Sequence, residues 1–313
     1  MKWSISKAKQ FQRCQRQWYY KEIVGRHSAP TGSFRREVYL LGLLKSISQW
    51  RGDIVDKVLT MSFLTWHKHR VRLDPDKIIA NARRHFDSQL AVAKDHHLHK
   101  PGLTPSKWSD FVVFRCMEYE GAIAQNELDV AWQEIEQAIR NLFEMRSIAE
   151  AMKDAEVLVA QRSLQFRHSG MNVMAVPDLV VFAKERPPVI IDWKVHAFGV
   201  QEAWLQLGIY ALALSRAKPH KDFPRDYSSW KPIEVKLLEV QLLKQDLREY
   251  QLSTTDVVRL ENHITTTSHE MLAAVGTLRP KYEDLIPEDF SVTSYPTTCE
   301  QCSYKRICWE EGA

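Results

Sequence analysis

One stretch of the chain combines strand-forming residues with charged side chains in a way that restricts the possible folds. Residues 175–210 read AVPDLVVFAKERPPVIIDWKVHAFGVQEAWLQLGIY. The apolar runs 179–182 and 189–195 are rich in Val and Ile and flank a charged turn that contains two prolines, over residues 184–188. This composition predicts two neighbouring β-strands joined by a short connection.

Two acids and a lysine can converge on this predicted hairpin. Side chains alternate between the faces of a strand, so Asp192 and Lys194 point to one face and Trp193 to the other. Asp178 would join them from the neighbouring strand. The ordinary explanation of an Asp-x-Lys pair is an exposed ion pair. These charges lie inside an apolar run, however, and buried charges are normally paired or bound to metal, which favours a functional role.

The segment after the hairpin adds two polar side chains. Residues 200–215 predict a helix, on which Gln206 and Tyr210 lie one turn apart on the same face. Carboxylates from adjacent strands can hold one or two Mg²⁺ ions, which polarise a phosphate and activate water. Lys194 could orient that water or neutralise charge on the phosphate. Gln206 and Tyr210 would steady the site or the nucleic-acid backbone, so the pattern predicts metal-dependent phosphodiester hydrolysis.

Four of the five cysteines form a second pattern. Cys299-x-x-Cys302 and Cys308 supply three thiols within one short segment, and Cys14 is the natural fourth ligand. In a cytosolic protein, closely spaced cysteines favour metal binding over disulfides. Sites with four cysteine ligands suit zinc or an iron–sulfur cluster, and the spacing alone does not choose between them. Cys116 is isolated, and we expect it to be a small buried apolar side chain.

Composition and charge set wider limits. The 313 residues are 44% hydrophobic and 26% charged, which is ordinary for a globular chain able to bury a large core. The apolar runs are far shorter than the roughly 20 residues that span a bilayer, and the first residues lack the apolar segment of a secretory signal. We therefore expect a cytoplasmic protein that does not contact membranes. The net charge of +4 permits nucleic-acid binding without arguing strongly for it.

The rest of the chain predicts mostly helices before residue 153 and strands after it. Residues 3–24 predict a basic helix capped by Ser4 or Ser6. His96, His97 and His99 could ligate a metal, but a solvated basic loop is the expectation there. The tail from Lys281 onward predicts irregular structure.

Together the motifs resemble a known family. Pro177-Asp178, Asp192-Trp193-Lys194 and Gln206-x-x-x-Tyr210 resemble the core of the PD-(D/E)xK nucleases, in their RecB-like branch. One early cysteine with a late Cys-x2-Cys-x5-Cys is similar to the iron–sulfur members, such as the AddB nuclease domain and the four-cysteine CRISPR-associated exonucleases. The resemblance implies a [4Fe–4S] cluster, in preference to zinc, that staples the chain ends together. Its ligands would be Cys14, Cys299, Cys302 and Cys308.

The resemblance also implies a fold and an activity. The fold would be a single α/β nuclease domain over 1–313 with a restriction-endonuclease-like core, in which helices flank a central mixed sheet. Its segments would be N-terminal helices (1–56), a helical insertion (57–152), the nuclease core (153–245), and a C-terminal helix with the cysteine tail (246–313). The activity would be Mg²⁺- or Mn²⁺-dependent DNA cleavage by an exonuclease acting on single strands or ends, in repair or mobile-element defence.

Partners and a rival function follow from the same comparison. The chain has no Walker A sequence, so any unwinding would come from a helicase or another repair or defence protein. The rival is a nucleic-acid-binding or scaffold protein that keeps the fold and does not cut DNA. Intact Asp178, Asp192 and Lys194 favour the enzyme.

One position departs from the pattern of the resembled branch. Its members carry a metal-binding histidine in a Gly-x-x-x-His element before the core. Here Gly52-x-x-x-Asp56 offers a carboxylate, and the alternative register, Gly42-x-x-x-Ser46, offers a serine. Asp56 would be a third metal ligand in the first register. The alternative for Asp56 is a carboxylate near the start of a helix, where it interacts favourably with the helix dipole.

Overall fold

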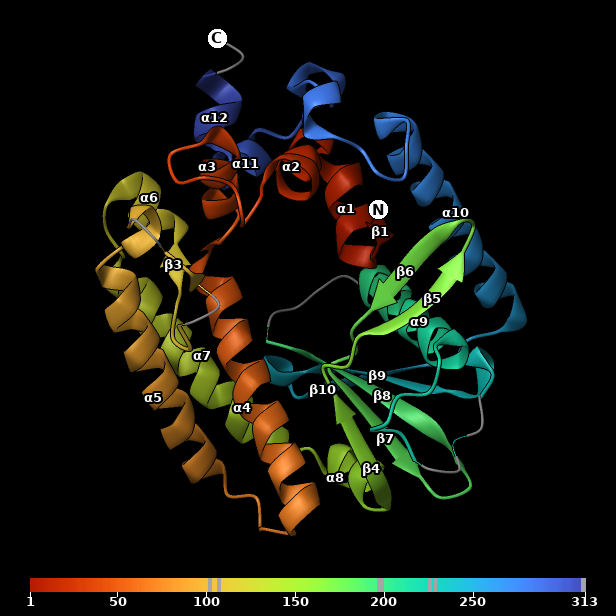
Figure 1. Cartoon of the computed structure of the whole chain (residues 1–313). Helices are drawn as coiled ribbons and strands as arrows, with labels where there is room; N and C mark the ends of the chain where they lie inside the picture. Colours follow the sequence, from red (N-terminus) through yellow and green to blue (C-terminus); the bar gives the residue numbers. More distant parts are fainter. Residues whose placement is uncertain (101–102, 106–107, 196–199, 225–226, 228–229, 311–313) are drawn as a thin grey trace.

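In the computed structural model of the chain, a five-stranded sheet separates two groups of helices (Figure 1). The structure describes residues 1–100, 103–105, 108–195, 200–224, 227 and 230–310. The sheet order is β10-β9-β8-β7-β4; β8 and β9 run parallel, and the other neighbours are antiparallel. The expected α/β class, with a central mixed sheet flanked by helices, is confirmed.

The strands form this sheet and two smaller ones. The five-stranded sheet contains β4 (Ala155–Ala160), β7 (Leu179–Ala183), β8 (Arg186–Lys194), β9 (Lys236–Gln241) and β10 (Asp246–Tyr250). A three-stranded sheet contains β1 (Lys2–Trp3), β6 (Met171–Ala175) and β5 (Leu164–His168), and a parallel pair contains β2 (Leu44–Lys45) and β3 (Val113–Phe114).

Helices precede, interrupt and follow the strands. Before β4 they are α1 (Ile5–Arg13), α2 (Gln15–Tyr19), η1 (Tyr20–Val24), α3 (Phe34–Leu41), α4 (Ile47–His69), α5 (Pro75–Lys94), η2 (His97–His99), α6 (Arg115–Glu120), α7 (Gln125–Glu144) and α8 (Arg146–Met152). After β8 they are α9 (Val200–Arg216), η4 (Pro232–Glu234), η5 (Leu242–Lys244), α10 (Thr254–Val275), η6 (Tyr282–Asp284), η7 (Pro287–Asp289), α11 (Pro296–Glu300) and α12 (Lys305–Glu310).

The sheet has an apolar core on each face. One core joins the sheet to α4, α5 and α7, and the other joins it to α1, α9 and α10. Successive residues of β8 alternate between the two cores, as the strand period requires. Trp193 stacks on Phe63 of α4, with ring centroids 5.7 Å apart and planes at 13°. Asp192 and Lys194 consequently face the side of α1 and α9.

The hairpin turn is shorter than the sequence predicts. β8 begins at Arg186, opposite Ala183, so the turn comprises only Lys184 and Glu185. The two prolines that were assigned to the turn lie in the strand, at a register shift against β7. Proline cannot donate to the strand ladder, which is why prolines are found at bulges and strand starts.

Two helix predictions at the N-terminal end need correction. The helix expected over 3–24 is interrupted at Cys14, whose extended backbone (φ −163°) ends α1 and begins α2. Asp56 does not lie near a helix start: α4 begins at Ile47, after a capping box formed by Ser46 and Gln49. Gly52 is accommodated inside α4, and the predicted segment boundary at 56 falls within this helix.

The two ends of the chain pack against each other through aromatic and polar contacts. Figure 1 shows α11 and α12 beside α2 and α3. The Tyr19 ring stacks on Phe290 at 4.3 Å, and Arg16 Nε donates to the carbonyl oxygens of Pro287 and Phe290 at 3.0 and 3.3 Å. Between residues 281 and 310, the part of the tail that the structure describes, four short helices and a docked aromatic side chain replace the irregular structure that was expected. Among the described residues, no helix has the length and apolar character needed to span a bilayer.

This packing predicts the effect of removing the docked ring. Phe290 is fully buried, so Phe290→Ala should lower the free energy of unfolding by about 3 kcal/mol or more, through lost burial and the remaining cavity. Ile286→Ala, at a side chain that is 55% exposed in the same segment, is the matched control and should change stability little. Denaturant unfolding of the three proteins measures both effects. Equal losses in the two variants would mean that the tail does not dock through Phe290.

Candidate active site

The register of β7 against β8 brings the predicted acids together. Leu179 lies opposite Ile191 in this antiparallel pair. Asp178 precedes Leu179 and Asp192 follows Ile191, so the two acids meet at the same end of the sheet. The backbone N–H of Trp193 donates to Asp178 Oδ2 at 3.0 Å. Asp178 is half-buried, whereas the Asp192 side chain is only 1% exposed. The strand pairing alone places two carboxylates and Lys194 within one small region.

Lys194 and two side chains of α9 surround Asp192. Lys194 Nζ lies 2.5 Å from Asp192 Oδ2 and donates to Gln206 Oε1 at 3.4 Å. Gln206 Nε2 in turn donates to Asp192 Oδ1 at 3.1 Å and to the Tyr210 hydroxyl oxygen at 2.6 Å. The helical spacing of four residues puts Gln206 and Tyr210 on the face that covers the strand end. The structure thus unites the acid, lysine, glutamine and tyrosine in one network.

Asp56 reaches the same region from the interior of α4. Gln161, in the connection after β4, donates from Nε2 to both Asp56 oxygens (3.2 and 3.0 Å) and to Asp178 Oδ1 (3.2 Å). Ser46, from the other possible register, instead caps α4. The geometry therefore favours Asp56 as the third acid of the group. The Gln161 amide is surrounded by three carboxylate oxygens, two from Asp56 and one from Asp178. A small cation bound to carboxylates has similar surroundings.

Burial raises the pKa of all three carboxyl groups. It raises the pKa of Asp56 to about 6. The pKa of Asp178 is well above its usual range because of burial first, and then because of the charges of Asp192 and Asp56. Burial also raises the pKa of Asp192, although the Lys194 charge opposes that shift. Crowded, desolvated carboxylates repel one another, and a bound cation would relieve this repulsion.

The donor set fits a hard divalent ion. All three acids offer oxygen atoms, the ligands that Mg²⁺ and Mn²⁺ prefer. Asp192 is buried, with Oδ2 in an ion pair with Lys194 and Oδ1 accepting from Gln206. The Lys194 ammonium balances the charge of Asp192, whereas Asp56 and Asp178 have no cationic side chain recorded within 4 Å among the described residues. Asp56, Asp178 and Asp192 are therefore the residues that could hold a catalytic metal.

Sequence reasoning missed three polar side chains near this group. Gln161 has a left-handed backbone (φ 49°), which is uncommon for a residue other than glycine and often marks a functional position. Lys9 of α1 has its pKa lowered by burial, with opposing influences from Glu202 and Asp192. Glu239, opposite Asp192 on β9, is fully buried and accepts from the Tyr250 hydroxyl at 2.7 Å. Of the three, only Glu239 could have been found from the sequence, because it is a charged residue inside an apolar strand run.

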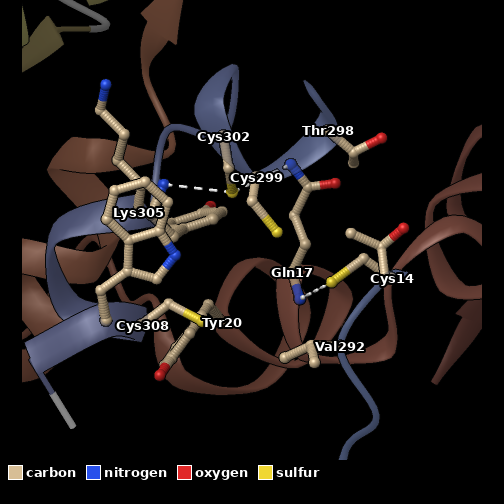
Figure 2. A pocket seen from close by; sticks show the side chains of 12 residues that line it. Cys14, Gln17, Tyr20, Val292, Thr298, Cys299, Cys302, Lys305 and Cys308 are labelled. Atoms are coloured by element: carbon tan, nitrogen blue, oxygen red, sulfur yellow. Dashed lines mark hydrogen bonds between the residues drawn. The ribbon is translucent and has the colours of Figure 1, made fainter. Parts of the chain in front are cut away.

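The four predicted cysteines line a single cavity. Figure 2 shows Cys14, Cys299, Cys302 and Cys308 around this cavity. Cys14 lies at the break between α1 and α2, and Cys299 lies in α11. Cys302 follows α11, and Cys308 lies in α12. All four are free thiols, and Cys116 of α6 is not among the residues that line the cavity.

The surroundings of these thiols suit metal-bound sulfur. Gln17 Nε2 and the backbone N–H of Tyr304 each donate to Cys302 Sγ at 3.4 Å, and the Gln17 backbone N–H donates to Cys14 Sγ at 3.4 Å. Burial raises the pKa of Cys302 to about 11, and the nearby Cys14 and Cys308 contribute in the same direction. Thiolates are the form that binds metal, so the positive charge of a metal would be needed to keep such a crowded group deprotonated.

Comparison with known proteins identifies the family. The profile of the PD-(D/E)XK nuclease superfamily matches residues 2–309. The chain therefore belongs to this superfamily, whose members are phosphodiester hydrolases that use divalent metal ions and act on nucleic acids. No curated protein gave a significant match.

Two solved structures show distant likeness. The crystal structure of SSO0001 shares 12% identity at a TM-score of 0.28, over 62% of this chain and 78% of that one. A presumed exonuclease from Eubacterium rectale shares 10% identity at a TM-score of 0.35, over 90% of this chain and 94% of its own. The family assignment rests on the profile match.

The raised pKa of Asp56 gives a pH-dependent prediction. A carboxyl with a pKa of about 6 when folded and 3.8 ordinarily binds its proton more tightly in the folded state. Without divalent ions, lowering the pH from 7 to 5 should therefore stabilise the parent protein relative to Asp56→Asn by about 1 kcal/mol. Affinity for Mg²⁺ or Mn²⁺ should fall over the same range, because protons compete for the same oxygens.

Denaturant unfolding at several pH values, with EDTA present, measures the stability difference. Titration with Mn²⁺ at the same pH values measures the affinity. A stability difference between the parent and Asp56→Asn that stays constant from pH 7 to pH 5 would contradict a buried, proton-binding Asp56.

Proposed function

We propose that this chain is a Mg²⁺- or Mn²⁺-dependent deoxyribonuclease of the RecB-like branch, acting as an exonuclease on single strands or DNA ends. The observation that carries this proposal is the convergence of Asp56, Asp178 and Asp192 with Lys194 at one end of the sheet. Asp56 comes from α4, Asp178 from the residue before β7, and Asp192 and Lys194 from β8. Packing requirements give no reason to collect one buried acid, two half-buried acids and a lysine there.

Each side chain has a separate task in this proposal. Asp178 and Asp192 would hold the metal, with Asp56 completing an all-oxygen ligand set. When bound, the ion polarises the scissile phosphate and lowers the pKa of the attacking water. Lys194 is held near Asp192 and Gln206, so its ammonium group is oriented to donate to that water or to a phosphate oxygen.

Gln206 and Tyr210 keep this arrangement in place. Gln206 contacts Asp192, Lys194 and Tyr210 at once, so it fixes their relative positions. Burial, with the Asp192 and Asp178 charges, raises the pKa of Tyr210 well above its usual range, and its hydroxyl therefore keeps its proton. Such a hydroxyl remains available to position the site or the DNA backbone.

In this proposal a DNA strand would bind in a polar cleft near the start of α4. The cleft has a volume of about 1030 Å³ and runs between the N-terminal helices, the start of α4 and the cysteine tail. Its lining includes Asp53, one helical turn before Asp56. The basic residues that line it are Arg13, Lys21, Lys45 and Arg115. Contacts of this kind bind phosphates without reading sequence, as an exonuclease requires.

The cysteine cavity is proposed to hold a [4Fe–4S] cluster bound by Cys14, Cys299, Cys302 and Cys308. N–H groups directed at Cys14 and Cys302 sulfur support this proposal, because such hydrogen bonds are a usual feature of iron–sulfur sites. A cluster would join the helix break at Cys14 to the two tail helices. A single zinc ion is the alternative occupant of the same four thiols.

The proposed setting is DNA repair or defence against mobile elements. Unwinding would then be supplied by a helicase or another protein partner. Cytoplasmic location is part of this proposal. A scaffold that binds nucleic acid without cutting it is the other function compatible with the fold, and the catalytic test separates the two.

Lys194→Ala should reduce cleavage by a factor of about 100 or more, because one charged donor at the reacting phosphate is lost. Its DNA affinity should change little, since a single lysine contributes little to a surface with several phosphate contacts. Lys184→Ala, in the exposed turn of the same hairpin, is the matched control and should cut normally. Cleavage of labelled single- and double-stranded DNA with Mg²⁺ or Mn²⁺ gives the rates.

Two results would count against the proposal. Undiminished cleavage by purified Lys194→Ala protein would remove Lys194 from the site. A parent protein that binds DNA and cuts neither substrate with either ion would support the scaffold function.

Protein purified without oxygen should be brown and contain iron and sulfide in equal amounts. Cys14→Ser should lose the colour and unfold at a lower temperature, because metal binding is coupled to folding. Cys116→Ser, outside the cavity, should keep both properties. Optical spectra, metal analysis and thermal melts test these points. Colourless parent protein with one zinc per chain would replace the cluster by a four-thiolate zinc site.

A further inference from the structure

Three metal-ligating side chains meet outside both of these sites. His96 and His99, from the segment around η2, and Glu118 of α6 offer ligand atoms that all lie within 4.8 Å of one another. His96 Nε2 is 2.7 Å and His99 Nε2 is 3.1 Å from the same oxygen, Glu118 Oε2. Neither histidine had a predicted partner, because Glu118 is distant in sequence.

The local backbone explains this convergence. His96 adopts a left-handed conformation (φ 43°), which ends the preceding helical segment and starts the turn of η2. The two rings then lie 6.2 Å apart at 72°, with their Nε2 atoms toward Glu118. His96 Nδ1 is buried without a hydrogen-bond partner among the described residues, so the polar contacts of this ring are made through Nε2.

Arg306 of α12 holds the carboxylate from the other side. Its guanidinium donates to Glu118 Oε1 at 2.6 Å and to Glu37 of α3 at 2.8 Å. The Glu118 side chain is only 3% exposed. Glu118 Oε1 therefore binds Arg306, with His99 Nε2 also 3.3 Å away, while Oε2 faces both imidazoles. A carboxylate fixed in this way by a second group is the usual arrangement around a metal ligand.

We propose that His96, His99 and Glu118 form a zinc-binding site, separate from the carboxylate group and from the cysteine cavity. Two imidazole nitrogens and one carboxylate oxygen are a common ligand set for zinc, with water in the fourth position. The three acids of the candidate active site offer only oxygen and suit harder ions. The charges are also compatible, because Glu37, Glu118 and Arg306 together carry one net negative charge when the histidines are neutral.

The site has a structural consequence. Zinc would tie the η2 turn to α6 and, through Arg306, to α12 and α3. Arg306 lies two residues before Cys308, so the helical insertion and the cysteine tail would be joined through Glu118. This role is independent of nuclease activity, and it can be tested without measuring cleavage.

The test is zinc binding by protein without a histidine tag, in the presence of excess Mg²⁺ to occupy oxygen ligands. His99→Ala removes a half-exposed ligand. His97→Ala is the matched control, because His97 lies 3.4 Å from Asp95 Oδ2 and is not part of the group. Parent and His97→Ala should each bind one more zinc ion per chain than His99→Ala. Added zinc should raise their melting temperatures more than that of His99→Ala.

Cysteine ligands do not confuse this comparison, because all three proteins keep the same thiols. Cobalt(II) gives a second reading: the additional ion bound by the parent over His96→Ala should lack the intense thiolate-to-cobalt absorption. Equal zinc content and equal melting shifts in parent, His99→Ala and His97→Ala would overturn the proposal. The three side chains would then form only a hydrogen-bonded cluster.

Discussion

The antiparallel pairing of β7 with β8 is the constraint on which the candidate active site depends. It sets Leu179 opposite Ile191, and a shift by one residue would exchange the two faces of β8. Asp192 and Lys194 would then point into the apolar core of α4, α5 and α7, and Trp193 would leave its contact with Phe63. Because both faces of the sheet are covered by apolar cores, the register is strongly determined. The chemistry of the site therefore derives from the same pairing that organises the core.

The carboxylates at this sheet end are stabilised by neighbours rather than by solvent. Gln161 and the Trp193 backbone satisfy Asp178, while Gln206 and Lys194 satisfy Asp192. Their raised pKa values show that this compensation is incomplete. A divalent ion would supply the missing positive charge, which gives a physical reason for metal dependence in this family. The cysteine cavity follows a similar logic, because burial raises the pKa of the Cys299, Cys302 and Cys308 thiols and a bound metal would oppose that shift.

Much of the fold and the proximity of the main candidate site residues could be predicted from the sequence, because both follow from local periodicity. Alternation along β8 gave the faces of Asp192, Trp193 and Lys194, and helical spacing gave the pairing of Gln206 with Tyr210. Gln161 could not be found in this way, because its role depends on a single left-handed residue with no repeating pattern. The place of Asp56 within α4 differs from the expected helix start, because α4 begins at Ile47 and continues through Gly52. The group around Glu118 was missed for another reason: its members meet only through tertiary packing.

Gln161 has a consequence for how an ion enters the site. Its exposed side chain already places an N–H group among the oxygens of Asp56 and Asp178, so these acids are held in position by the folded chain itself. When an ion binds there, it would replace the Gln161 N–H group as the partner of these oxygens, and the backbone would not need to move. Rotation of an exposed side chain takes picoseconds to nanoseconds. Rotation of Gln161 would therefore not limit binding of an ion at the proposed site, where loss of water from Mg²⁺ is slower.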